Sequence, residues 1–357
     1  MDFMQHALAV GKKARGISNP NPPVGAVVVA DGVIVGEGCT GPAGGPHAEI
    51  KALRDSGSMA YGASIYVTLE PCCHIGRTGP CTDAIINSGI SEVHVAVVDP
   101  DVRVGGKGIS ILRERGIKVV VGEHEKQAEL DLEAHIKLST TDLPFITVKF
   151  AVSLDGKIAT RSGNSQWITN TLSRQKSHVM RMENDAVMVG INTVLMDDPK
   201  LTARGKAYSE SARQPTRIIV DSNFRTPVNS SMFKERGQTI ITGVFENEPL
   251  AYPTGVKTYF CSDSGGRVDL KSMLKEIGKE PISSILVEGG GELIGSLFDL
   301  GLVDKVVAFI APVVIGGEDS PNAVKGKGAL DMSAIYRLCD VKTESLGTDM
   351  MVSGYCE

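Results

Sequence analysis

Two short segments contain the residues whose types and spacing are best suited to chemistry. His47 and Glu49 stand in the first, and Cys72 and Cys81 stand in the second. One imidazole and two thiols can bind zinc, and a catalytic zinc leaves its fourth position to a water whose pKa it lowers. Glu49 is better suited to general acid/base work, in which it takes a proton from that water and passes it to a departing amine. The set predicts a zinc-dependent deaminase site.

The elements around these residues are expected to place them at helix starts. Alternating apolar residues predict a strand over 63–69, directly before Pro71 and Cys72, and Cys81 opens a helix-like run around 82–87. An amphipathic helix over 47–53 would carry His47 and Glu49. We therefore expect both thiols to lie at helix N-terminal turns, where the helix dipole helps to keep them deprotonated.

Other residues near these segments leave alternatives open. Cys73 is adjacent to Cys72 and is expected to be a spare buried thiol. His74 could serve as a fourth ligand, but its place in the loop with Arg77 suits a substrate contact better. Asn21 lies in a Pro-flanked loop, where it is either a turn residue or an amide aimed at a pyrimidine edge.

Length and composition indicate a globular protein with two domains. The chain has 357 residues, of which 42% are hydrophobic, and 37 basic residues against 42 acidic ones give a net charge of -5. This balance argues against a broad nucleic-acid surface. Seven cysteines, at least two of them used for metal, imply no disulfide framework. Without a signal peptide or membrane span, we expect a soluble, cytoplasmic protein. Separately, we expect the protein to be a homo-oligomer.

The first half is expected to form a three-layer α/β/α domain. The dipeptide Asp31-Gly32 predicts a hairpin, and apolar runs predict central parallel strands. The expected helices are 2–14, 47–53, 82–87, 109–115 and a long polar one over 123–138, and the expected strands are 24–30, 33–35, 63–69, 93–98 and 118–121. Residues 139–142, before Pro144, are expected to form the linker.

A second and different α/β domain is expected after the linker, so that the domains are 1–142 and 143–357. The expected strands are 145–152, 186–189, 217–221, 239–242, 284–287 and 306–310, and the expected helices are 171–182 and 292–300. Gly289-Gly290-Gly291 lies between a strand and a helix, where backbone N–H groups could meet a pyrophosphate.

Several motifs resemble one known family along nearly the whole chain. In the first half they are Asn21-Pro22-Pro23-Val24-Gly25, His47-Ala48-Glu49, Pro71-Cys72 through Gly79-Pro80-Cys81, and Asp99-Pro100. In the second half they are Lys149 to Lys157, Ser165-Gln166-Trp167-Ile168, Gly190 to Arg204, and Glu288-Gly289-Gly290-Gly291. Together they resemble the bifunctional riboflavin-biosynthesis deaminase/reductase family.

The resemblance implies a cytidine-deaminase-like domain followed by a dihydrofolate-reductase-like domain. The first would deaminate 2,5-diamino-6-(5-phosphoribosylamino)pyrimidin-4(3H)-one with one Zn²⁺. The second would reduce the ribosyl side chain of the product, 5-amino-6-(5-phosphoribosylamino)uracil, to ribityl with NADPH. The implied partners are these small phosphoribosylated pyrimidines, and neither nucleic acid nor membrane is expected.

The resemblance also implies roles for individual residues. In the deaminase half they are Glu49 for catalysis, His47, Cys72 and Cys81 for the metal, and Asn21, His74, Arg77 and Asp99 for substrate. Cofactor binding falls to Ala151, Trp167, Thr193, Asp197, Ser222, Gly290, Gly291, Glu292, Leu293, Ile294, Gly295 and Ser296. Reductase substrate binding falls to Lys149, Ser165, Arg181, Leu201, Arg204 and Glu288.

Some of these residues have a second interpretation. Trp167, the only tryptophan, would by itself be read as a core residue, and only the motif makes it a cofactor contact. Asp197 and Asp198 could act near the transfer site. Arg161 or Arg225 is expected to meet the 2′-phosphate of NADPH.

The chain departs from the family pattern at Thr40, near a position that often carries His, and at Asp101, where Asn is common. These departures weaken the substrate map of the first half. Two rival hypotheses remain on the residues alone. One is a nucleic-acid-editing deaminase, which would need a basic surface, and the other is a protein whose zinc only braces a loop.

Overall fold

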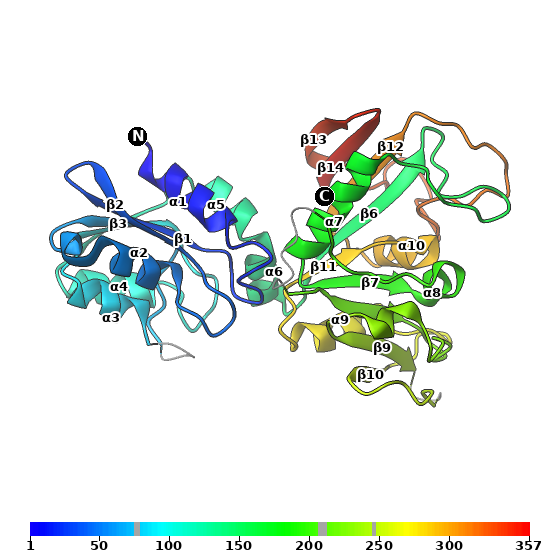
Figure 1. The fold of residues 1–357 in the computed structure, drawn as a ribbon, viewed down its shortest axis with the longest axis horizontal. Helices are drawn as coiled ribbons and strands as arrows, with labels where there is room; N and C mark the ends of the chain where they lie inside the picture. The colour runs from blue at the N-terminus through cyan, green and yellow to red at the C-terminus, as the bar shows by residue number, and fades with distance from the viewer. Residues whose placement is uncertain (75–78, 206–212, 245–247) are drawn as a thin grey trace. The chain divides into compact units, whose positions relative to one another are not determined.

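The chain divides into two compact units, Met1–Asp142 and Leu143–Glu357. The structure is a computed structural model that describes residues 1–74, 79–205, 213–244 and 248–357 (Figure 1). Within these ranges, no helix combines the length and the apolar character that crossing a membrane requires. The two units are described separately below.

The first unit is a five-stranded sheet with helices on both faces. The sheet order is β2-β1-β3-β4-β5, with β1 antiparallel to β2 and β3, and β3, β4 and β5 parallel. The strands are β1 (Gly25–Ala30), β2 (Val33–Cys39), β3 (Ser64–Leu69), β4 (Glu92–Val97) and β5 (Lys118–Val121). The helices are α1 (Phe3–Lys12), α2 (Ala48–Ser56), η1 (Gly57–Ala60), α3 (Cys81–Asn87), α4 (Lys107–Glu114), α5 (Glu125–Asp131) and α6 (Glu133–Thr141).

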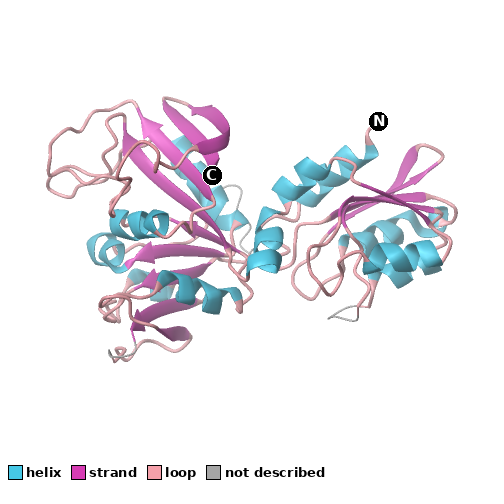
Figure 2. Ribbon diagram, turned by 180° about the vertical axis from the view of Figure 1, so that it is seen from behind, coloured by secondary structure: helices cyan, strands magenta, loops and turns pink. Residues whose placement is uncertain are grey.

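Alternation along the strands creates the three layers. Val27 and Val29 on β1 pack with Met4 and Leu8 of α1, whereas Ala26 and the other alternate residues face the cluster of α2, α3 and α4. Successive side chains of a strand point to opposite faces, so an apolar strand needs cover on both sides. Figure 2 shows helices on both faces of the sheet. The predicted three-layer architecture is confirmed.

Three details of the first unit differ from expectation. The apolar run ending at Val121 forms the edge strand β5 rather than a central one, and none of its residues is buried. The long polar helix predicted over 123–138 is two helices, because the chain leaves helical geometry at Leu132. The predicted linker is mostly helix, since α6 continues to Thr141 and ends at Asp142 in a left-handed conformation.

The second unit is a nine-stranded sheet in the order β10-β9-β8-β7-β11-β6-β12-β14-β13. Its strands are β6 (Phe145–Ser153), β7 (Ala186–Gly190), β8 (Thr216–Val220), β9 (Thr239–Val244), β10 (Val256–Cys261), β11 (Ser284–Val287), β12 (Lys305–Ala311), β13 (Leu338–Leu346) and β14 (Asp349–Cys356). Its helices are α7 (Thr171–Glu183), α8 (Ile191–Asp197), η2 (Ser231–Lys234), α9 (Leu270–Gly278) and α10 (Gly291–Asp299). All six predicted strands are present.

Helices α9 and α10 pack with one face of this sheet, while α8 packs with the other. The run from β10 through β12 is parallel, so the carboxyl ends of these strands meet at one edge. In open α/β sheets this edge is where ligands bind. Strand β10, helices α8 and α9 and the antiparallel hairpin β13–β14 were not predicted, although Leu270, Met273, Leu274 and Ile277 on α9 have the spacing of an amphipathic helix.

We predict that Gly25→Ala strongly destabilises the first unit. A Cβ at Gly25 would lie 2.0 Å from the Ala7 carbonyl oxygen and 2.5 Å from the Gly11 nitrogen, so α1 could not approach β1. Such overpacking against backbone should lower the free energy of unfolding by about 3 kcal/mol. Gly79→Ala, whose Cβ would have no atom of the described residues within 4 Å, is the control and should change the free energy of unfolding by less than about 0.5 kcal/mol.

The measurement is urea unfolding followed by circular dichroism and by tryptophan fluorescence. The single tryptophan, Trp167, belongs to the second unit and reports that unit's transition. Equal stability of Gly25→Ala and the unsubstituted protein would contradict the close α1–β1 approach.

Candidate active sites

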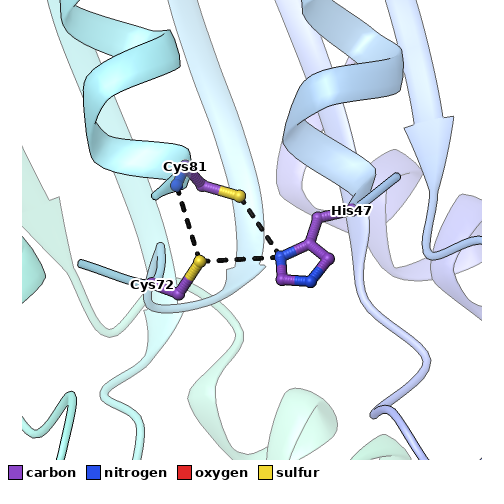
Figure 3. A group of neighbouring side chains, drawn as sticks. All are labelled: His47, Cys72 and Cys81. Carbon is purple, nitrogen blue, oxygen red and sulfur yellow. Dashed lines mark hydrogen bonds between the residues drawn. The ribbon is translucent and has the colours of Figure 1, made fainter. Parts of the chain in front are cut away.

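Three side chains in the first unit converge on one point, where they could hold a metal ion (Figure 3). His47 is the residue that precedes α2, and Cys81 is the first residue of α3. Their side chains meet Cys72, with Nδ1 of His47 3.3 Å from Sγ of Cys81 and 3.6 Å from Sγ of Cys72. The three ligand atoms all lie within 4.8 Å of one another.

The predicted helix start at Cys72 is wrong, and the reason is local. Cys72 lies in the loop after β3, and its sulfur accepts a hydrogen bond from the backbone N–H of Cys81 at 3.5 Å. The thiol therefore faces the N-terminus of α3 without belonging to a helix itself. The other two expectations, Cys81 and His47 at helix starts, are confirmed.

The donor set fits a catalytic zinc site. Two Zn–S bonds and one Zn–N bond in tetrahedral geometry bring neighbouring ligand atoms to about 3.5 Å, which matches the spacings around His47. In the described residues no fourth His, Cys, Asp or Glu joins this group, so these residue types leave one tetrahedral position without a ligand there. His74 thus does not serve as a fourth ligand here.

The electrostatics of the site depend on burial. Glu49, in the first turn of α2, is 4% exposed, and burial together with nearby Cys72 raises its pKa to about 7. A hydrogen bond from Cys81 and another from His47 lower the pKa of Cys72, while the same contact raises the pKa of the Cys81 thiol. Metal ligation requires both thiols to be deprotonated, so zinc binding would release any proton that they hold.

The loops beside this group carry the other predicted residues. Nδ1 of His74 is buried and has no hydrogen-bond partner among the described residues, whereas Arg77 lies outside them. Asn21 is half-buried in its loop, and its backbone N–H donates to Ser18. Cys73 is partly exposed, and burial raises the pKa of its thiol.

Asp99, at the end of β4, is held by a network that the sequence did not reveal. Its Oδ1 accepts from Nε2 of His135 at 3.0 Å. The backbone of Asp99 and of the segment after it is anchored by Glu70. This residue is 3% exposed and accepts hydrogen bonds from the N–H groups of Asp99, Gly106 and Ile109. The sequence signal for this network was Glu70, a carboxylate that stands between an apolar strand and Pro71.

Both departures from the family pattern are accommodated by local partners. Thr40 is buried, and its hydroxyl oxygen accepts from the N–H of Val24 at 3.1 Å. Asp101 forms a bidentate pair with Arg103, which lowers the pKa of Asp101 to about 2. The negative charge of Asp101 is therefore compensated by the neighbouring Arg103.

A cleft of ≈ 520 Å³ lies in the second unit, beside the predicted Gly turn. Of the predicted cofactor residues, Ser222, Gly290, Glu292, Leu293 and Ser296 line it. Gly289 and Gly290 have φ values of 119° and 80°, at which a residue with a side chain would be strained. Gly291 then begins α10. The turn can thus present backbone N–H groups at a helix start.

The remaining predicted cofactor residues lie elsewhere. The Thr193 hydroxyl is close to the turn, since a Cβ on Gly290 would be 3.5 Å from it. The side chain of Ile294 belongs to the core, and Gly291 and Gly295 face residues 322–326. Asp197 is exposed at the end of α8, and Ala151 lies on β6.

Trp167 is 69% exposed, so the interpretation as a core residue is wrong. The Arg174 guanidinium lies 4.6 Å from the centroid of its ring. Asp198 accepts from the N–H and the hydroxyl of Ser231 and so fastens a loop.

Of the two arginines expected to meet a 2′-phosphate, only Arg225 lines the cleft. Arg161 is exposed and is not part of that lining. Arg267 and Lys327 line it as well, and both were missed because they lie in irregular segments. The cleft thus has basic side chains from three separate loops.

Glu288 is the centre of a second cluster in this unit, directly after β11. Arg181 donates to both of its oxygens at 2.8 and 2.6 Å, and Nζ of Lys149 lies 3.4 Å away. Burial alone would raise the pKa of Glu288, but the two cations outweigh it and lower the pKa to about 2. The same carboxylate raises the pKa of Arg181 against the effect of its burial.

The cluster continues to Arg204 through the backbone of Thr202. Nη1 of Arg181 donates to the Thr202 carbonyl at 3.0 Å, and His178 links the same carbonyl to Arg204. Leu201 has a φ of 51° and its side chain is buried in the core, so only its backbone is available to a ligand. Ser165 is half-buried in the loop before Trp167.

Comparison with known proteins agrees with both sites. The model of the "Cytidine and deoxycytidylate deaminase zinc-binding region" matches residues 1–97, and that of the "RibD C-terminal domain" matches residues 144–352. A zinc-binding deaminase region and a reductase domain therefore follow each other in one chain, which defines a bifunctional deaminase/reductase.

Full-length relatives identify the family. The chain is 41% identical to riboflavin biosynthesis protein RibD of Aquifex aeolicus (strain VF5) over 358 residues, 98% of this chain and 97% of that protein. It is 40% identical to RibD of Escherichia coli (strain K12), with 95% and 92% covered. The chain belongs to the RibD family and is an enzyme of riboflavin biosynthesis.

Solved structures agree over the whole length. Acinetobacter baumannii RibD superimposes with a TM-score of 0.90 at 33% identity, covering 99% of this chain and 98% of that one. The Thermotoga maritima diaminohydroxyphosphoribosylaminopyrimidine deaminase/5-amino-6-(5-phosphoribosylamino)uracil reductase gives 0.88 at 36% identity, with the same coverage. The predicted order of a deaminase-like and a reductase domain is thus confirmed.

We predict that Glu288→Gln destabilises the second unit in a pH-dependent way. The folded pKa of about 2 is below the ordinary 4.5, so the stabilisation is complete above pH 4.5 and is lost as the pH falls toward 2. The loss on substitution should be about 3 kcal/mol at pH 6 and about half of that at pH 3.

Urea unfolding followed by Trp167 fluorescence measures this difference. Glu276→Gln, which removes an exposed ion pair with Lys279, is the control and should cost under about 0.5 kcal/mol at any pH. A Glu288→Gln effect that did not change with pH would show that the carboxylate is not ionised in the folded protein.

Proposed function

We propose that the first unit hydrolyses the 2-amino group of 2,5-diamino-6-(5-phosphoribosylamino)pyrimidin-4(3H)-one. The second unit then reduces the ribosyl side chain of 5-amino-6-(5-phosphoribosylamino)uracil to ribityl with NADPH. The name of the Thermotoga maritima relative contains both substrates, which supports this assignment. The observation that carries the proposal is the convergence of His47, Cys72 and Cys81 beside the buried Glu49.

In the deaminase reaction, His47, Cys72 and Cys81 would hold one zinc ion, which would supply Lewis-acid activation of a water molecule. Glu49 would take one proton from the attacking water and pass it to the ring nitrogen. It would then take the second proton from the hydroxyl group added to the ring carbon and pass it to the amino group, which leaves as ammonia when the carbon–nitrogen bond breaks. Burial of Glu49 excludes bulk water from this transfer.

Four residues are assigned to the deaminase substrate: Asn21, His74, Arg77 and Asp99. The buried Nδ1 of His74 has a hydrogen-bonding position that a substrate could fill. Asp99 is a strand-end carboxylate whose orientation is set by His135. Arg77 is assigned by its motif and its permanent charge, which suits the phosphate.

In the reductase reaction, the cleft beside Gly290 would hold NADPH, which would supply the hydride. Its cofactor contacts are Ala151, Trp167, Thr193, Asp197, Ser222, and residues 290–296. Five of these, together with Arg225, line the cleft, which supports the assignment. The glycine turn gives the pyrophosphate close access to backbone N–H groups.

The reductase substrate is assigned to Lys149, Ser165, Arg181, Leu201, Arg204 and Glu288. The supporting feature is charge, since three of these residues are basic and only Glu288 is acidic, which favours a phosphorylated ligand. Each nitrogen of Arg181 donates one hydrogen bond to Glu288 or Thr202, so we assign to Arg181 the role of orienting the carboxylate toward a sugar hydroxyl.

The domain assignments 1–142 and 143–357 belong to this proposal. A cytoplasmic location, a homo-oligomeric state and the absence of nucleic-acid partners stay predictions. The rival hypothesis of a nucleic-acid-editing deaminase gives no reason for the second domain. A zinc that only braces a loop gives no reason for a buried Glu49 beside an open coordination position.

We predict that Glu49→Gln abolishes deamination but retains zinc. Loss of the proton carrier should reduce ammonia release by about 10²- to 10⁴-fold, whereas His47, Cys72 and Cys81 still bind the metal. The measurements are ammonia release from the diaminopyrimidine, NADPH oxidation with the deaminated product, and zinc content by elemental analysis.

Chelation of the unsubstituted protein provides the complementary experiment. Removal of zinc should stop ammonia release and leave NADPH oxidation intact, because His47, Cys72 and Cys81 all belong to the first unit. Full ammonia release from Glu49→Gln or from the metal-free protein would sink the proposed mechanism.

We also predict that Arg225→Ala weakens the preference for NADPH over NADH. Loss of a charged contact to the 2′-phosphate should raise KM for NADPH about tenfold and leave KM for NADH unchanged. Arg161→Ala is the matched control, since Arg161 does not line the cleft, and its kinetics should be unaltered. The opposite pattern would move the 2′-phosphate to Arg161.

A further inference from the structure

His178, to which no role has been assigned so far, is hydrogen-bonded to a proposed substrate residue. It lies on α7, one turn before Arg181. Nδ1 of His178 is 3.2 Å from the Thr202 carbonyl oxygen, and its Nε2 is 3.2 Å from Nε of Arg204. The imidazole therefore bridges the buried part of the Glu288 cluster and an exposed arginine.

The partners of His178 determine its tautomer. A carbonyl oxygen only accepts and a guanidinium only donates, so Nδ1 carries the proton and Nε2 presents its lone pair to Arg204. A doubly protonated ring could not accept from Arg204 and would add a third positive charge beside Arg181 and Arg204. The environment agrees, because burial and the two arginines lower the pKa of His178 to about 4.

Arg204 differs from Arg181 in what its donors do. Every nitrogen of the Arg181 guanidinium is engaged with Glu288 or Thr202. Arg204 is bound to the protein only through Nε in the described part of the chain, which leaves both terminal nitrogens available to a ligand. An exposed arginine has many rotamers, so a fixed bond at Nε limits the directions in which the terminal nitrogens point.

We propose that His178 is a positioning residue that holds Arg204 in the orientation required to bind the phosphate of the reductase substrate. This inference rests on the proposed role of Arg204. The neutral imidazole supplies an acceptor without a charge, whereas a carboxylate at this place would cancel the positive charge that attracts the phosphate. Thr202 fixes the ring, and the ring in turn fixes the arginine.

The test compares His178→Leu with His178→Gln. Leucine has neither donor nor acceptor, whereas the glutamine amide retains one of each and can bridge Thr202 and Arg204. We expect His178→Leu to raise KM for the phosphorylated substrate about five- to tenfold with little change in kcat. His178→Gln should restore most of the loss, and KM for NADPH should stay constant in both variants.

Arg204→Ala and the double variant His178→Leu/Arg204→Ala separate positioning from general damage to the fold. If His178 acts through Arg204, the double variant should bind the phosphorylated substrate no worse than Arg204→Ala alone. The dephosphorylated substrate should show the same KM in all variants. Ammonia release by the first unit of the same chain serves as the control for intact protein.

The outcomes distinguish this inference from the proposed function. A raised KM in Arg204→Ala with a normal KM in His178→Leu would overturn the role of His178 alone. Additive effects in the double variant, or a failure of His178→Gln to restore binding, would do the same. A normal KM in Arg204→Ala would reject the proposed role of Arg204 and, with it, this one.

Discussion

In each site, the loops depend on hydrogen-bond donors that surround a carboxylate, and this carboxylate is buried directly after a parallel strand. Glu70 follows β3 and Glu288 follows β11, and both side chains are almost fully buried. An ionised carboxylate in such a place is costly unless donors surround it. Glu70 is served by three backbone N–H groups, and Glu288 by two cationic side chains. Because the donors must lie within hydrogen-bond distance of the carboxylate, the segments that carry these donors are held in place.

The two solutions have different consequences for chemistry. Backbone donors bring no charge of their own to Glu70, and they hold in place the segment that carries Asp99 and the start of α4, next to the loop of Cys72. Side-chain donors at Glu288 carry charge of their own, so the cluster with Lys149 and Arg181 is net positive. The first arrangement builds a frame for a metal site. The second gives a net positive cluster that continues through Thr202 and His178 to the exposed Arg204.

The zinc group and its context could be predicted from the sequence because its spacing is local. His47, Cys72 and Cys81 are each adjacent to an element with a clear apolar pattern. The contacts of Glu288, His178 and Arg204 were out of reach, since they join elements far apart in the chain. The edge position of β5 was also hidden, because Val119 and Val120 are equally compatible with a central strand. Read without its motif, Trp167 suggested a core residue, but it is 69% exposed, and the Arg174 guanidinium lies 4.6 Å from the centroid of its ring.

Burial acts in opposite directions on the two acidic residues assigned to the reactions. Glu49 is buried beside thiols, and its pKa rises to about 7, whereas Glu288 is buried beside two cations, and its pKa falls to about 2. A cation placed at the thiols would favour the ionised form of Glu49, ready to accept a proton. Glu288 holds its charge so firmly that it cannot donate a proton near neutral pH. It can accept a hydrogen bond from a sugar hydroxyl, so any proton needed in the reduction has to come from another group.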